Sequence, residues 1–267
     1  MEQGKREFSY VFIHGFESTG KGYKAQLFRK AFINNKSEKS NPPGGCYLVS
    51  PTIWEEEEEF ENTSFARMFT KVTAAVRDAA EHGEKVILLG SSFGGLLVTR
   101  FMQTKQPGHE LVSGCAIVSP ALHFTDVLAD PQTGSSFLVR MLVDKEGLGK
   151  LPHTALMAEW ERTGAIKIGY LKMELGWKPV DFKWKSFADF REQVSCVDGA
   201  GLGVPTFVLH SIGDDVIPYR YTEDWLGSLP EKDRAMVSYH LIEKGSHGLG
   251  DVPELTDMIT DWVRKTF

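Results

Sequence analysis

Short apolar runs alternate along the chain with longer segments that are apolar on one face only. This alternation is typical of a parallel sheet whose strands are covered by helices. In the run Val86–Leu89 every residue is apolar, as expected for a strand that is buried on both faces. The pattern predicts strands at Phe8–His14, Tyr47–Ile53, Lys85–Gly90, Gly114–Ser119, Thr206–His210 and Val237–Ile242.

Helices are predicted between these strands. Residues 64–81 place Phe65, Met68, Phe69 and Val72 on one face at the helical spacing, and Ser64 is a candidate N-cap. A second helix is expected over residues 94–106, before Pro107 and Gly108, and a last one over residues 253–265. The fold class is therefore α/β, with a mostly parallel sheet of about six strands.

Residues 123–203 break the alternation. This stretch is rich in aromatic residues, and residues 166–184 alternate as a hairpin does, while the rest is of helical type. An insertion at this point lies above the carboxyl ends of the strands, where open α/β sheets bind ligands. We therefore predict a cap over a substrate pocket at 123–203, and a core formed by 1–122 and 204–267. The alternative is a second packing layer with no role in binding. The aromatic residues are Phe137, Trp160, Tyr170, Trp177, Phe182, Trp184, Phe187 and Phe190.

Composition and charge narrow the class of protein. Of 267 residues, 42% are hydrophobic and 25% are charged, as in an ordinary globular protein. A chain of this length buries roughly three quarters of its unfolded surface, so it needs no disulfide or metal to fold. The formal charge of −6 comes without a basic stripe, so no nucleic-acid partner is expected. No segment resembles a signal peptide or a membrane span, which predicts a cytoplasmic protein.

The three cysteines do not form a metal-binding pattern. Cys46 and Cys115 lie in apolar, strand-like runs, and Cys196 lies in the insertion. There is no CxxC pair and no cluster of Cys and His, so zinc is not expected. We predict buried free thiols, no metal and no organic cofactor.

The segment Gly90–Gly94 reads Gly-Ser-Ser-Phe-Gly, and it follows an apolar strand and opens a helix. This is the Gly-x-Ser-x-Gly pattern of a nucleophile elbow, in which a sharp turn exposes the serine hydroxyl above the sheet. The flanking positions must be small because strand and helix approach closely there. The context predicts Ser92 as a nucleophile.

Two further residues fit this interpretation. Asp214 follows the strand Thr206–His210, and His247 follows the strand Val237–Ile242. The chain order Ser, Asp, His is that of the α/β-hydrolases and differs from the orders of chymotrypsin and subtilisin. We predict that His247 is the general base and that Asp214 orients it.

The segments Phe12–Phe16, Gly90–Gly95, Gly213–Pro218 and Gly245–Gly248 resemble the α/β-hydrolase superfamily, and most closely its small esterases and thioesterases. They are spread over most of the chain in the family's order, although here the His-Gly strand is nearly the first element. The resemblance implies an α/β-hydrolase fold. It also implies an oxyanion hole formed by the backbone N–H groups of Phe16 and Phe93.

Other acids and histidines compete for these roles. Asp215 adjoins Asp214 but is expected to point elsewhere, and Asp126 follows a strand from which some family members take their acid. His14 belongs to the oxyanion turn, where a structural role is the more common one. For His123, His153, His210 and His240 the sequence context indicates a hydrogen-bonded or surface role.

The acidic run Glu55–Glu59 has two interpretations. Acidic residues before a helix interact well with its N-terminal dipole and need no partner. Alternatively, the run lies at the pocket mouth and favours cationic substrates.

The function expected from these residues is hydrolysis of a carboxylic ester or thioester through an acyl-enzyme. The aromatic insertion suggests an apolar acyl or aryl group on a small-molecule substrate. The alternatives are another serine reaction on the same fold, namely C–C or amide hydrolysis or acyl transfer, or a ligand-binding protein without catalysis.

Overall fold

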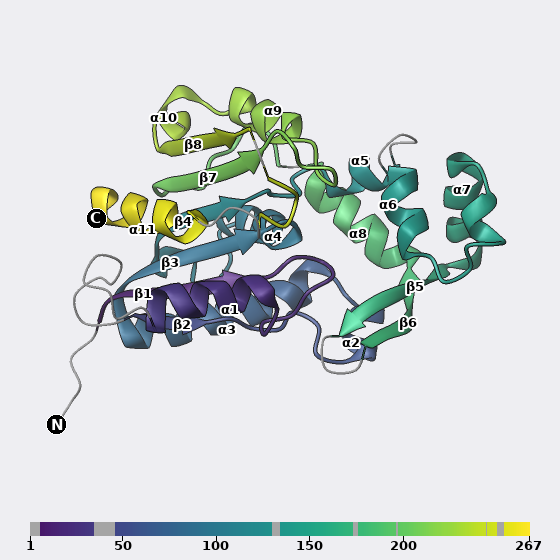
Figure 1. The fold of residues 1–267 in the computed structure, drawn as a ribbon, viewed down its shortest axis with the longest axis horizontal. Coiled ribbons are helices and arrows are strands. Elements are labelled where there is room, and N and C mark those ends of the chain that lie inside the picture. Colours follow the sequence, from purple (N-terminus) through teal and green to yellow (C-terminus); the bar gives the residue numbers. More distant parts are fainter. Residues whose placement is uncertain are drawn as a thin grey trace.

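The computed structural model describes residues 6–34, 46–129, 134–172, 176–195, 197–243, 245–249 and 254–267. Within these ranges a six-stranded sheet has the order β2-β1-β3-β4-β7-β8, and all of its neighbouring strands are parallel (Figure 1). The predicted α/β class and sheet are confirmed. The strands are β1 (Arg6–Ile13), β2 (Tyr47–Val49), β3 (Gly83–Ser91), β4 (Val112–Val118), β7 (Thr206–Ser211) and β8 (Val237–Ile242).

Helices cover both faces of this sheet. Tyr10 and Phe12 of β1 pack in one apolar layer with α1 (Tyr23–Arg29) and α11 (Leu255–Thr266). Val11 and Ile13 pack in the opposite layer with α3 (Phe65–His82) and α4 (Phe93–Gln103). Successive strand residues thus enter two different cores, which explains why the central strands are apolar at consecutive positions.

The predicted helix over 64–81 is confirmed as α3. Ser64 is its N-cap, and the Ser64 side chain accepts a hydrogen bond from the Arg67 N–H. The strand predicted at Tyr47–Ile53 is shorter than expected, since β2 ends at Val49. Pro51 has no N–H to donate to a sheet ladder, and β2 is an edge strand paired only with β1.

Residues between β4 and β7 form an insertion beside the carboxyl ends of the strands (Figure 1). It contains the expected antiparallel hairpin, although Trp184, predicted as its last strand residue, instead begins α8. Met173, also predicted in the hairpin, lies outside the described residues. The elements of the insertion are α5 (Phe124–Ala129), α6 (Gly134–Met141), α7 (His153–Thr163), β5 (Ala165–Lys172), β6 (Gly176–Lys183) and α8 (Trp184–Val194).

Several short helices carry too little periodicity to be recognised in the sequence. They are α1, α2 (Glu57–Glu61), α9 (Arg220–Ser228) and α10 (Glu231–Arg234). The helix predicted over 94–106 ends earlier, at Gln103, and the last helix runs from Leu255 to Thr266. Among the helices in the described ranges, none is both long and apolar enough to cross a membrane.

Candidate active site

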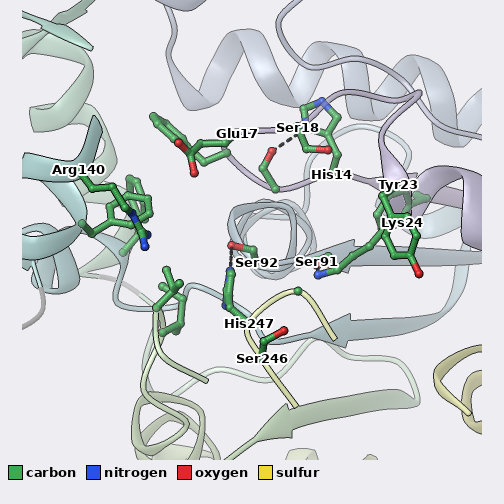
Figure 2. A pocket seen from close by; sticks show the side chains of 18 residues that line it. His14, Glu17, Ser18, Tyr23, Lys24, Ser91, Ser92, Arg140, Ser246 and His247 are labelled. Atoms are coloured by element: carbon green, nitrogen blue, oxygen red, sulfur yellow. Dashed lines mark hydrogen bonds between the residues drawn. The ribbon is translucent and has the colours of Figure 1, made fainter. Parts of the chain in front are cut away.

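Ser92 occupies a sharp turn between β3 and α4. Its φ is 56°, a left-handed value that a residue with a side chain adopts at some cost. The Ser92 N–H donates to the Val118 carbonyl at the end of β4 (2.9 Å), which fixes the turn to the neighbouring strand. The hydroxyl points into a pocket at the carboxyl end of the sheet (Figure 2).

Glycines allow the backbone around Ser92 to pack closely. A Cβ on Gly94 would lie 2.2 Å from the Ile13 carbonyl oxygen, and a Cβ on Gly90 would lie 2.5 Å from the Gly94 carbonyl oxygen. A Cβ on Gly15 would lie 3.2 Å from the Ser92 Cβ. The small residues that the elbow requires are therefore placed where helix α4 and the turn after β1 meet.

His247 bridges Ser92 and Asp214. His247 Nε2 lies 2.8 Å from Ser92 Oγ, and Nδ1 lies 2.8 and 3.0 Å from the two oxygens of the Asp214 carboxylate. A carboxylate only accepts hydrogen bonds, so Nδ1 carries the proton and Nε2 accepts the Ser92 hydroxyl proton. The structure brings together the three residues predicted from the sequence (Figure 2 labels Ser92 and His247).

The Asp214 carboxylate is fully buried and heavily hydrogen-bonded. Its Oδ1 accepts from the N–H groups of Val216 (2.9 Å) and Ile217 (2.8 Å). Burial alone would raise the pKa of Asp214, but hydrogen bonds from His210 and His247 outweigh it and hold that pKa well below its ordinary value. Asp214 is thus a stable anion facing the His247 ring.

His210 contacts the same carboxylate, a role that the sequence analysis did not predict. Its Nε2 lies 3.2 Å from Asp214 Oδ2 and 3.0 Å from the Ile217 carbonyl oxygen. Both of these atoms are acceptors, so Nε2 carries a proton, while Nδ1 lies 2.9 Å from the Thr222 hydroxyl. His210 is buried at the end of β7 and contacts the same Asp214 oxygen, Oδ2, as His247 does.

Ser211 joins the two loops that carry Asp214 and His247. Its hydroxyl donates to the Gly245 carbonyl (2.7 Å) and accepts from the Gly213 N–H (3.0 Å). The acid turn and the histidine loop are therefore held together by one buried side chain. Nothing in the sequence pattern marks Ser211, because it is one of several polar residues at a strand end.

The competing residues lie elsewhere. Asp215 is exposed. Asp126 pairs with His123, with 3.1 Å between Asp126 Oδ2 and His123 Nδ1. His14 is buried, and its Nε2 accepts from the Ile53 N–H (2.9 Å), a structural role. Burial lowers the pKa of His14 to about 4, which keeps its ring neutral. His153 and His240 likewise form hydrogen bonds away from Ser92, with the Leu128 carbonyl and the Ser238 hydroxyl.

The Phe16 and Phe93 backbone flanks the Ser92 turn. Within the described ranges, neither N–H group has a hydrogen-bond partner. Both rings are buried, with centroids 5.7 Å apart. Aromatic residues of the insertion pack on them: Phe124 on Phe16 (5.2 Å) and Phe190 on Phe93 (5.2 Å). The insertion therefore contacts the side chains of both candidate oxyanion residues.

The pocket around Ser92 has a volume of about 420 Å³. The core contributes Ser92, His247 and the turn after β1, and the insertion contributes an apolar wall with one cation. The acidic run Glu55–Glu59 does not contribute to the lining, and Glu59 pairs with Lys71 instead (2.9 Å). The insertion residues at the pocket are Phe124, Phe137 and Arg140, and Val216 and Ile217 of the core lie beside them.

The cysteines in the described ranges do not line the pocket around Ser92. Cys46 and Cys115 are buried and free, as predicted, and Cys196 lies outside the described residues. Burial raises the pKa of Cys46 to about 11. In the described part of the chain, no group of three or more His, Cys, Asp or Glu side chains is arranged to hold a metal ion.

Solved structures with a similar fold come from several organisms. A protein of Agrobacterium vitis S4 is 22% identical over 97% of this chain and 88% of its own, with a TM-score of 0.66. Est1E of Butyrivibrio proteoclasticus, in its ferulic acid complex, is 14% identical over 98% and 90%, with a TM-score of 0.66. The monoacylglycerol lipase of Paleococcus ferrophilus is 18% identical over 99% and 97%, with a TM-score of 0.62. At these identities the likeness establishes the fold.

Comparison with curated proteins found no match to the sequence. The model of the alpha/beta hydrolase family, in contrast, matches residues 11–257, which include both the sheet and the insertion. The structural relatives share that fold, and the resemblance predicted from the sequence is confirmed. The chain belongs to the alpha/beta hydrolase family.

Proposed function

We propose that this protein is a serine hydrolase that cleaves a carboxylic ester or thioester through an acyl-enzyme. The observation that carries the proposal is the continuous hydrogen-bonded chain from Ser92 Oγ through His247 to the buried Asp214 carboxylate. Membership of the alpha/beta hydrolase family supports hydrolase activity in general. Two structural relatives, Est1E with bound ferulic acid and a monoacylglycerol lipase, also support ester chemistry.

In the first half of the reaction, His247 Nε2 takes the hydroxyl proton of Ser92 while Oγ attacks the carbonyl carbon. The resulting oxyanion accepts hydrogen bonds from the N–H groups of Phe16 and Phe93. Each such donor typically contributes about 3–4 kcal/mol to lowering the barrier. The imidazolium, stabilised by Asp214, then gives its proton to the leaving alcohol or thiol, and the acyl-enzyme forms.

In the second half, a water molecule replaces the leaving group. His247 removes one proton from the water as its oxygen attacks the acyl carbon, and it returns that proton to Ser92 Oγ as the Ser92–acyl bond breaks. The products are the free acid and a regenerated Ser92 hydroxyl. The same residues therefore serve as base and acid in turn.

We further propose that residues 123–203 act as a cap and that the acyl or aryl group of the substrate is apolar. Phe124 and Phe137 of the insertion, with Val216 and Ile217, form an apolar wall beside Ser92. Such a wall favours an apolar substituent. The predicted cytoplasmic location stays a prediction.

The test is labelling with a fluorophosphonate, followed by peptide mass spectrometry and turnover of p-nitrophenyl esters. A single adduct on Ser92 and ester hydrolysis are expected, with kcat falling roughly a thousandfold or more in Ser92→Ala. Ser246→Ala removes another serine hydroxyl at the pocket and is expected to keep the adduct. Absence of an adduct in the folded protein would overturn the proposal and favour a ligand-binding protein without catalysis.

A further inference from the structure

Lys24 places an ammonium group at the pocket, from the first turn of α1. Its Nζ donates to Ser91 Oγ, and Ser91 is the residue immediately before Ser92. In Figure 2 the Lys24 side chain reaches Ser91 on one side of the Ser92–His247 pair, while Arg140 and Glu17 lie on the other side. The pocket thus has a cationic end formed by the core, separate from the wall formed by the insertion.

No carboxylate of the described residues pairs with this ammonium. Lys24 makes one hydrogen bond, to a neutral hydroxyl, and no ion pair within the described ranges. The negative charge of Asp214 acts to raise the pKa of Lys24, but the Asp214 carboxylate is already bonded to His210 and His247. A largely buried ammonium without a counter-ion is unfavourable, so an anion that enters the pocket gains a partner there.

The second cation of the pocket is placed differently. Arg140 lies over the ring of Phe137, with 5.4 Å between its guanidinium carbon and the ring centroid. Burial raises the pKa of Glu17, and the positive charge of Arg140 acts in the opposite direction. An acidic residue, Glu17, therefore lines the pocket within the electrostatic range of Arg140, whereas Asp214, which acts on Lys24, is not among the lining residues.

Lys24 is itself partly exposed, and its end of the pocket is close to the reacting hydroxyl. Tyr23, at the edge of the pocket beside Lys24, is 59% exposed. Since the Cα atoms of adjacent residues are 3.8 Å apart, Lys24 Nζ lies within roughly 11 Å of Ser92 Oγ. A charged group a few bonds from the scissile carbonyl can span this distance.

We propose that Lys24 is a specificity residue that binds an anionic group of the substrate, a carboxylate or a phosphate, at the α1 end of the pocket. The proposal rests on the serine hydrolase function proposed above and narrows its substrate to an acidic ester or thioester. Burial lowers the pKa of Lys24 to about 8, so the group is still largely charged at pH 7. The apolar wall then accommodates the remainder of the substrate.

The kinetic test compares matched esters. The mono-p-nitrophenyl ester of adipate carries the charge in the acyl chain, and its neutral partner is the methyl p-nitrophenyl diester. 3-Acetoxybenzoate carries the charge in the leaving group, and its neutral partner is methyl 3-acetoxybenzoate. We expect kcat/KM to favour the anionic member of at least one pair tenfold or more, and this ratio to fall below about threefold in Lys24→Met.

Two variants identify the cation responsible. Lys30→Met removes an exposed lysine next to α1, and Arg140→Met removes the other cation of the pocket; both are expected to keep the preference. Equal rates for anionic and neutral esters would overturn the proposal. So would a preference that survives in Lys24→Met or disappears in Arg140→Met.

A binding measurement separates this proposal from the proposed function. Calorimetric titration of Ser92→Ala with adipate is expected to show binding that is at least tenfold weaker in Ser92→Ala/Lys24→Met. If esters are not hydrolysed but adipate binding depends on Lys24, the hydrolase proposal fails and the anion site stands. If neutral esters are hydrolysed but adipate does not bind to Ser92→Ala, the reverse holds.

Discussion

His210 Nε2 lies 3.2 Å from Asp214 Oδ2, the carboxylate oxygen that also lies 2.8 Å from His247 Nδ1. Two imidazoles therefore contact one carboxylate oxygen, and one ring is buried while the other lines the pocket. The buried His210 ring is hydrogen-bonded to Thr222 and to the Ile217 carbonyl. The position of Asp214 therefore depends on these two groups through His210. His210 is a positioning residue for Asp214.

Replacing His210 with Phe is expected to weaken both the fold and the reaction. The change leaves the Thr222 hydroxyl and the Ile217 carbonyl without their buried partner, which costs about 1–3 kcal/mol of unfolding free energy. Looser placement of Asp214 should lower kcat about tenfold. Urea unfolding and ester kinetics measure the two effects. His240→Phe, on neighbouring β8, is the matched control, and equal behaviour of the two variants would contradict the assigned role.

Asp214 and Asp215 form a natural pair of adjacent acids, one buried and one exposed. Asp214→Asn should lower kcat by about 10⁴, because the amide does not hold the His247 tautomer in which Nε2 accepts the serine proton. Asp215→Asn should change kcat by less than about threefold, since surface substitutions usually have small effects. Steady-state kinetics on one p-nitrophenyl ester measure kcat for both variants. A large loss in Asp215→Asn with little in Asp214→Asn would reassign the acid.

Gly94 and Gly227 test the packing around the elbow. A Cβ at Gly94 would meet the backbone oxygens of Ile13 and His14 at 2.2 and 2.6 Å, whereas a Cβ at Gly227 in α9 has no neighbour within 4 Å. Gly94→Ala should therefore lose more than about 2 kcal/mol of stability. Gly227→Ala should gain up to about 1 kcal/mol from helix propensity. Denaturant midpoints report both values, and a harmless Gly94→Ala would contradict the close contact.

Lys24 is predicted to lower stability in a pH-dependent way. Its folded pKa of about 8 lies below the value of about 10.4 expected for an unfolded lysine. The penalty for burying the charge is therefore fully present below pH 8. It is relieved as pH rises from about 8 to 10.4, where the unfolded chain binds the additional proton.

The free energy of unfolding of Lys24→Met should thus be about 1–3 kcal/mol higher than that of the wild-type protein at pH 7. This difference should shrink toward pH 10. Thermal or urea unfolding at several pH values measures it. Lys30→Met, at an exposed position, should stay within about 0.5 kcal/mol of wild type throughout. If the difference in unfolding free energy between Lys24→Met and wild type does not change with pH, burial of the Lys24 ammonium does not destabilise the protein.

The sequence predicts those features that are expressed as local patterns. The central strands are continuous apolar runs because two helix layers cover them, and the Ser92 turn is marked by glycines that close packing requires. His210 and Ser211 carry no such mark, since their roles arise only when the loops after β7 and β8 meet. Lys24 was also missed, because α1 has only Ala25 and Phe28 as buried residues and Gly22 in place of a side-chain cap.

The aromatic contacts between the insertion and the oxyanion turn have a consequence for substrate selection. Phe124 and Phe190 press on the rings whose own backbones carry the Phe16 and Phe93 N–H groups. A substrate too bulky for the pocket would displace these rings and, with them, the two N–H groups that we propose as oxyanion donors. Poor substrates should therefore bind with nearly unchanged KM and turn over slowly. A series of esters of increasing acyl length should show discrimination in kcat, so that the insertion selects by rate more than by affinity.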